Sequence, residues 1–159
     1  GMGQFGTALS PLDQLIVSLG RTRDPRAVPA ILEKAKLLTA SHAFSHHRAV
    51  ALALEMIGDP SAAPALAGLL TQPGMSGHVH DTVEEARRRD QESPGGTNAE
   101  RTRRDSLMEL HLARALYRCG DYGGVGKEIL TRYTRDLRGH LARHAKAVLD
   151  QGPKAKPEK

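Results

Sequence analysis

A repeated joint between two helices is the feature that most limits how this chain can fold. The letters DPRAVPAIL at 24–32 and DPSAAPAL at 59–66 lie 35 residues apart, and each follows an apolar run that ends in glycine. Self-similarity at a fixed period of this size is typical of stacked helical repeats. A degenerate third copy reads CGDYGGV at 119–125 and lacks both prolines. The sequence therefore predicts several copies of one hairpin unit.

The residue types of the joint are those that end one helix and start the next. Gly20 and Gly58 precede the two complete copies, and we expect them to take the left-handed conformation that terminates a helix. Asp24 and Asp59 are expected to cap the following helix through a side-chain oxygen. The proline after each aspartate suits a first helical turn, where its missing N–H costs nothing.

Apolar residues recur at helical spacing on both sides of each joint, and the alternation typical of strands is nowhere sustained. We predict helices at residues 11–21, 25–39, 42–57, 61–72, 98–119, 124–136 and 139–151. Their wide Ala-rich and Leu-rich faces favour helices covered by neighbouring layers on two sides. The predicted fold class is all-α, an α-α superhelix of HEAT-like stacked helical hairpins, with Leu54 and Ile57 between its layers.

The length of 159 residues fits one domain. Because Gly1 precedes Met2, we expect residues 1–9 to be an expression remnant and lead-in, and the chain to be part of a longer protein. Residues 10–151 are expected to form the repeat domain, and residues 152–159 a disordered basic tail. Neither a signal peptide nor a run of about 20 apolar residues is present, which predicts a soluble piece of unspecified compartment.

One segment, residues 73–105, interrupts the repeat period. It reads as a Gly-rich loop, a short and highly charged helix and a second turn. Its low apolar content predicts a mobile excursion on one rim of the stack that adds no layer to the core. Its replacement by a short Gly-Ser linker is then expected to leave the rest folded.

Two family resemblances are carried by these motifs. An apolar helix, Gly-Asp-Pro and Ala-x-Pro-Ala-Leu, best at 51–70, resembles the HEAT-like repeats of the phycobilisome-lyase type. In addition, LARALYRCGD at 112–121, YTRDLRGH at 133–140 and PGMSGH at 73–78 resemble the helical C-terminal region of bacterial FAD-dependent oxidoreductases. The second resemblance implies an accessory domain whose flavin-binding part is missing. The chain has no G-x-G-x-x-G turn after a strand, so no cofactor is expected within it.

Candidate metal ligands gather at the start of the charged helix. His78, His80, Asp81 and Glu84 offer imidazole and carboxylate groups suited to zinc or iron. A solvated loop entering a capped helix explains the same letters, and we favour it, so no metal is predicted. His140 and His144 lie four apart and are read as borders of a core stripe. The single cysteine, Cys119, is read as a small buried hydrophobe.

Positive charge gathers in the C-terminal half, with 11 basic against 6 acidic side chains from residue 106 onward. We predict an interaction rim that contains His78, His80, Arg87, Arg88, Arg114, Arg118, Arg135 and Arg138. Salt-bridged pairs on a solvated helix account for the arginines near residue 88. With three Tyr, two Phe and no Trp, the chain is poor in the aromatic residues that stack on bases, so nucleic acid is not the expected partner.

Three functions follow from these observations, in order of preference. The first is a non-catalytic accessory or protein-interaction domain, the C-terminal part of an FAD-dependent oxidoreductase, whose partner is another protein or an upstream domain of the same polypeptide. In that case FAD belongs to the missing parent domain. The second is a free-standing scaffold that binds an anionic partner through the basic C-terminal half. The third is a small metal-dependent enzyme.

Overall fold

The computed structural model describes residues 10–92 and 100–153, and all regular structure in these two ranges is helical. The α-helices are α1 (Pro11–Arg21), α2 (Val28–Ala35), α3 (Phe44–Ile57), α4 (Ala63–Leu70), α5 (Val83–Glu92), α6 (Glu100–Arg118), α7 (Val125–Tyr133) and α8 (Gly139–Gln151). Short 3-10 turns, η1 (Pro25–Ala27) and η2 (Pro60–Ala62), precede α2 and α4. The predicted all-α class is confirmed. The lead-in at 1–9 and most of the predicted tail lie outside the described residues.

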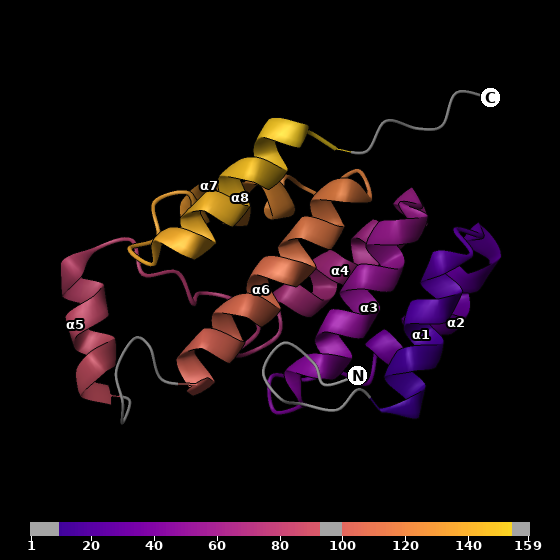
Figure 1. Cartoon of the computed structure of the whole chain (residues 1–159), viewed down its shortest axis with the longest axis horizontal. Coiled ribbons are helices and arrows are strands. Elements are labelled where there is room, and N and C mark those ends of the chain that lie inside the picture. The colour runs from indigo at the N-terminus through magenta and orange to yellow at the C-terminus, as the bar shows by residue number, and fades with distance from the viewer. Residues whose placement is uncertain (1–9, 93–99, 154–159) are drawn as a thin grey trace.

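The helices are arranged as a stack that runs from α1 and α2 at one end to α7 and α8 at the other (Figure 1). α3 packs against α1 on one side and α6 on the other, while α6 packs against α7, and α7 against α8. The second helix of each of the first two hairpins also contacts the layer that follows it: α2 packs on α3, and α4 packs on α6. This arrangement is consistent with the predicted HEAT-like α-α superhelix.

The predicted helices at 25–39 and 61–72 each divide into a 3-10 turn and a shorter α-helix, 28–35 and 63–70. Pro29 and Pro64 explain the division because each lies in the first turn of its α-helix. A proline deeper in a continuous helix would remove a hydrogen bond and clash with the preceding turn. As predicted, Asp24 and Asp59 cap these units, accepting hydrogen bonds from the amides of Arg26 and Ser61.

The two joint glycines have different roles, which corrects the expectation for one of them. Gly58 follows α3 with φ of 67° and is the left-handed terminator that was predicted. Gly20 instead lies inside α1 and is buried. A Cβ atom there would lie 2.4 Å from the Cα of Ala53, so Gly20 is required by the close approach of α1 to α3. The turn after α1 contains Arg23, a non-glycine residue with φ of 55°.

The third joint ends one helix and caps the next without prolines, and within the described residues no 3-10 turn precedes α7. Asp121 has φ of 60°, and Gly120, Gly123 and Gly124 also have positive φ. The Asp121 carboxylate accepts hydrogen bonds from the backbone amides of Gly126 and Lys127, both at 2.9 Å. A carboxylate in this position both caps α7 and complements the positive end of its dipole.

The core is a continuous band of Ala and Leu side chains shared by the layers. Leu54 is fully buried, whereas Ile57 is partly buried at the edge of the core, so the prediction holds fully only for Leu54. Cys119 is buried, and its thiol donates to the Leu54 carbonyl oxygen at 3.5 Å, in agreement with its predicted packing role. No helix in the two described ranges has both the length and the apolar character needed to cross a membrane.

The segment at 73–105 does not protrude as a whole, and that expectation is wrong for its first part. Met75, Val79 and His80 are buried, and the first two belong to the hydrophobic core. The loop is fixed by backbone hydrogen bonds to carboxylates, including that of Glu109 on α6. Only α5 matches the predicted excursion, since it buries no residue and lies at one edge of the molecule (Figure 1). Residues 93–99 lie outside the described residues.

The close approach at Gly20 generates a matched pair of substitutions. Gly20→Ala should lower the free energy of unfolding by about 1–3 kcal/mol, because the added methyl group overlaps backbone atoms of α3. Gly68→Ala, at an exposed position of α4 where an added Cβ would meet nothing within 4 Å, should instead leave the free energy of unfolding unchanged or raise it by up to about 1 kcal/mol. Urea denaturation of both variants measures the contrast. Equal effects would contradict the assigned role of Gly20.

Two linker replacements separate the structural from the protruding part of the 73–105 segment. Exchanging residues 83–92 for a Gly-Ser linker should leave cooperative unfolding intact, because α5 buries no residue. Exchanging residues 75–80 for a linker of equal length should cost about 3 kcal/mol or more, because core side chains are lost. Thermal melting followed by circular dichroism checks both. An unchanged melt of the second variant would restore the original expectation.

Candidate interaction surface

The eight residues of the predicted rim lie in different environments. Arg87, Arg88 and Arg135 are exposed; His78, Arg114 and Arg118 are half-buried; His80 and Arg138 are buried. Because a buried side chain presents no surface to a partner, His80 and Arg138 are not part of an exposed rim. Arg88 pairs with Glu85 and Glu92 on its own helix, as the salt-bridged interpretation predicted.

A buried polar network, here called the loop clamp, holds residues 77–80 against α6 and the turn after α7. The Glu109 carboxylate, buried on α6, accepts hydrogen bonds from the backbone amides of Gly77 at 2.9 Å and His78 at 2.8 Å. The Tyr133 hydroxyl donates to the same carboxylate at 2.8 Å. Burial and the neighbouring Glu109 raise the pKa of Tyr133 well above its usual value, so its hydroxyl remains a donor.

The second half of the loop clamp is the pair Asp136 and Arg138. Asp136 accepts a hydrogen bond from the His80 amide at 3.0 Å and a bidentate pair from the Arg138 guanidinium. Arg138 also donates to the His78 carbonyl oxygen at 2.9 Å and to Ser106 Oγ at 2.8 Å. Burial acts to raise the pKa of Asp136, but the hydrogen bonds from Arg138 and the backbone outweigh it and lower the pKa.

His80 lies inside the loop clamp without using its imidazole. Its backbone is bonded on both sides, because its amide donates to Asp136 and its carbonyl oxygen accepts from the Leu137 amide at 2.8 Å. Neither ring nitrogen has a hydrogen-bond partner among the described residues. Burial, and then the positive charge of Arg138, lowers the pKa of His80. The neutral imidazole therefore serves as a packing group.

The candidate metal ligands do not converge. His80 is buried, His78 and Asp81 are half-buried, and Glu84 is exposed on α5. His78 Nε2 is 2.8 Å from the Gly74 carbonyl oxygen. Within residues 10–92 and 100–153, no group of three or more His, Cys, Asp or Glu side chains is placed to hold a metal ion. The four residues thus occupy separate positions along a loop and a helix start.

A second charged cluster joins three layers of the stack. The buried Glu55 carboxylate on α3 accepts a hydrogen bond from Arg114 Nε at 2.7 Å and a short one from Arg118, both on α6. Arg118 also donates to Gln151 Oε1 at 2.6 Å, and Arg114 Nη1 lies 3.2 Å from His144 Nε2, so the cluster reaches α8. Arg114 and Arg118 therefore neutralise a buried acid instead of facing a partner.

The two histidines on α8 lie in different environments. His144 is half-buried, and its ring is tilted by 31° to that of His111 with centroids 6.1 Å apart, whereas His140 is exposed. His111 also meets Phe44 edge to face at 5.6 Å. Burial, together with Arg114, lowers the pKa of His111 to about 3. His144 thus borders the core as predicted, and His140 does not.

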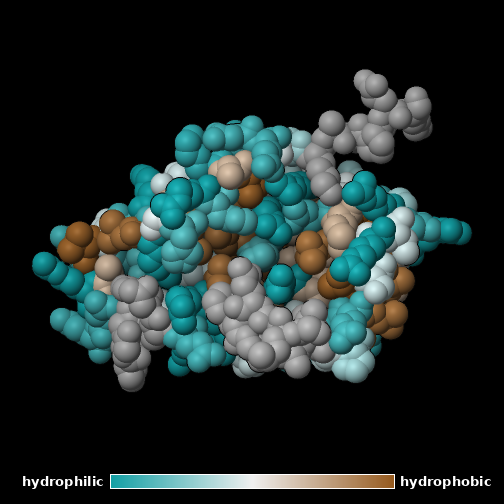
Figure 2. Space-filling model, in the orientation of Figure 1, coloured by the Kyte–Doolittle hydropathy of each residue, from teal (hydrophilic) through white to brown (hydrophobic). Residues whose placement is uncertain are grey.

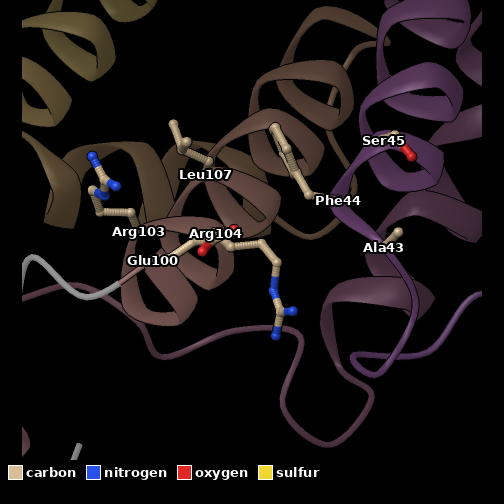
Figure 3. A pocket seen from close by; sticks show the side chains of 7 residues that line it. All are labelled: Ala43, Phe44, Ser45, Glu100, Arg103, Arg104 and Leu107. Atoms are coloured by element: carbon tan, nitrogen blue, oxygen red, sulfur yellow. The ribbon is translucent and has the colours of Figure 1, made fainter. Parts of the chain in front are cut away.

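A pocket opens between the start of α3 and the first half of α6, with a volume of about 160 Å³. Ala43, Phe44, Ser45, Glu100, Arg103, Arg104 and Leu107 line it (Figure 3). Phe44 extends from α3 toward α6, where Leu107 lies, and the two arginine side chains leave α6 in different directions (Figure 3). The pocket thus combines an apolar wall with two guanidinium groups and one carboxylate.

Sequence reasoning missed these features for identifiable reasons. Glu55 and Glu109 both interrupt apolar helical runs, and an acid within a core stripe is a usable signal of an internal cation. Glu55 pairs with Arg114, 59 residues away, and Glu109 accepts a hydrogen bond from the amide of His78, 31 residues away. No local pattern identifies partners at such separations. The pocket has no sequence signal, since Phe44 and Leu107 are ordinary core-type residues.

Buried neutral imidazoles predict that stability falls in acid. In the unfolded chain a histidine titrates near pH 6.5, but folded His111 resists protonation down to about pH 3. The contribution of His111 to the free energy of unfolding is therefore complete above pH 6.5. Below pH 6.5 this contribution declines by about 1.4 kcal/mol per pH unit, because the unfolded chain binds a proton that the folded chain does not. Urea titrations between pH 7.5 and pH 5 should show a shallower decline for His111→Leu. The exposed-site control His140→Leu should keep the wild-type slope, and equal slopes in all three proteins would refute the assignment.

Comparison with known proteins identifies the repeat type. Residues 47–72, which cover most of α3 together with η2 and α4, match the family model of the PBS lyase HEAT-like repeat. No curated protein and no solved structure matches the chain. The resemblance to FAD-dependent oxidoreductases gains no support from these comparisons. The chain thus contains a HEAT-like repeat, and the α3–α4 hairpin is that repeat.

Proposed function

We propose that this chain is a non-catalytic helical-repeat domain that binds another protein. The observation that carries the proposal is the HEAT-like repeat at 47–72, which forms the middle of a stack with α1 and α2 on one side and α6 on the other. Each repeat in such a stack contacts its neighbours and leaves a continuous surface along the array. Extended surfaces of this kind suit recognition of a protein segment.

The distribution of charged groups supports binding as the role of this stack. Glu55, Glu109 and Asp136 are buried carboxylates whose oxygens accept hydrogen bonds from arginines, backbone amides or a tyrosine of the same chain. Such groups hold layers together, which explains their burial without any reaction. The exposed groups are spread along the outside of the stack, where the face in Figure 2 is mostly hydrophilic with separate hydrophobic patches.

The finer proposal is that the partner is an upstream domain of the same polypeptide, a bacterial FAD-dependent oxidoreductase. It rests on the resemblance of residues 112–121, 133–140 and 73–78, and FAD would belong to that parent domain. Reading the native coding frame upstream of Met2 tests it. An oxidoreductase domain in that frame is the expected result, and a stop codon directly upstream would remove this version while leaving the binding proposal intact.

The second candidate is a scaffold for an anionic partner. Arg132, Arg135 and Arg143 are exposed in the C-terminal half, which favours it. However, Arg114, Arg118 and Arg138 are held by acids of the chain itself. Phosphate contacts would make retention on heparin fall steeply as salt rises. Absence of retention at low salt would eliminate this candidate.

Selection from a random peptide library tests the main proposal without knowledge of the partner. Panning on the folded chain should enrich related peptides that bind in fluorescence anisotropy with micromolar dissociation constants. Binding should disappear when urea unfolds the chain, because the surface exists only in the stack. Failure to enrich any sequence, or equal binding to the unfolded chain, would refute a peptide-binding role.

A further inference from the structure

A second pocket lies between α2 and α4, the second helices of the first two hairpins, which contact each other. Its volume is about 340 Å³, and most of its lining is apolar, including Leu32, Ala35 and Leu69. Gly68 on α4 also lines it, and an added Cβ atom there would meet nothing within 4 Å. The pocket is therefore an apolar recess with free space above α4, and it is called the α2–α4 groove below.

Leu37 is exposed in the turn that follows α2, one residue beyond Lys36 in the lining of the groove. Its relative exposure of 66% is the highest among the large apolar side chains of the described residues. The turn is ordered, because the Leu37 amide donates to the Lys34 carbonyl oxygen at 3.1 Å. The next residue, Leu38, is buried in the core. A fixed, exposed leucine thus lies beside an apolar recess, and burial of both would be favourable.

The charged groups at the α2–α4 groove compensate each other. Lys36 supplies the cation of the lining, and its ammonium lies 2.6 Å from the Glu33 carboxylate on the same helix. Gln72, the other polar lining residue, is neutral. The chain has a formal net charge of +5, so two copies repel each other unless they meet through a face without net charge. The groove is such a face, which favours a second copy of the chain over a strongly charged partner.

We propose that the chain forms a symmetric dimer in which Leu37 of each copy inserts into the α2–α4 groove of the other. A two-fold axis requires a self-complementary face. This face presents both an exposed side chain and a recess, so the same contact is made twice. It also carries both signs of charge, so Glu33 of one copy can face Lys36 of the other. The inference goes beyond the proposed function and does not depend on it.

The affinity of this dimer should be modest. Each copy contributes one leucine and one groove, which is less than the about 800 Å² per partner of a standard interface, so we expect a dissociation constant on the order of 100 micromolar. Sedimentation equilibrium of the folded full chain between about 10 micromolar and about 1 millimolar covers this range. The wild-type chain should change from monomer to dimer within it.

Two substitutions test the two halves of the contact. Leu37→Asp should weaken self-association by about tenfold or more, because the inserted side chain becomes charged. Gly68→Gln should have a similar effect, because its side chain would occupy the groove, where nothing else fills the space. Both positions are exposed in the monomer, so both variants should keep the thermal melt of the wild type.

The matched control is Leu137→Asp, the same substitution at an exposed leucine between α7 and α8. It should leave the dimer unchanged. An equimolar mixture of the Leu37→Asp and Gly68→Gln chains should associate more tightly than either variant alone, because the leucine of the second meets the intact groove of the first. A wild-type chain that remains monomeric up to about 1 millimolar, a control as weak as Leu37→Asp, or a mixture no tighter than its components would each overturn the inference.

Discussion

The contact between α1 and α3 sets the spacing of the stack, because it brings two helix backbones together without intervening side chains. Gly20 on α1 faces Ala53 on α3, where even a methyl group would overlap backbone atoms. α3 is enclosed on its other side by α6, and Leu54 and Ala53 are both fully buried. With α3 held between two neighbours, every later layer is positioned relative to it. The pocket depends on the same arrangement, since its walls come from α3 and α6.

Buried carboxylates hold the loop that enters the core between packed helices. The loop at 75–80 supplies core side chains, and the carboxylates of Glu109 and Asp136 accept hydrogen bonds from its backbone amides. A buried loop leaves amides unpaired unless side chains satisfy them, and that cost is what these two acids avoid. Removing Glu109 would leave the backbone amides of Gly77 and His78 without their carboxylate acceptor. The loop clamp is therefore part of the scaffold, and only α5 extends beyond it.

Pairing with acids of the same chain also distinguishes the arginines that stabilise the stack from those at its surface. Arg114, Arg118 and Arg138 compensate acids inside the stack, which removes them from contact with a partner. Arg103 and Arg104 line the pocket on α6, and Arg104 also pairs with Asp105. A net basic composition alone does not separate these two groups of arginines.

The sequence by itself determined the helical class, the repeat and the position of most helices, because these follow from local interactions. Aspartate caps, prolines in first turns and apolar spacing act within a few residues of one another. Only the tertiary structure decided that Gly20 serves a close helix contact, that Met75 and Val79 enter the core, and that Arg114 and Arg118 pair with Glu55. Each of these depends on partners more than 25 residues away, such as Ala53 for Gly20 and Asp136 for His80. The pocket is of the same kind, since Phe44 and Leu107 meet only when α3 and α6 pack, and no local pattern records which distant helix a residue will face.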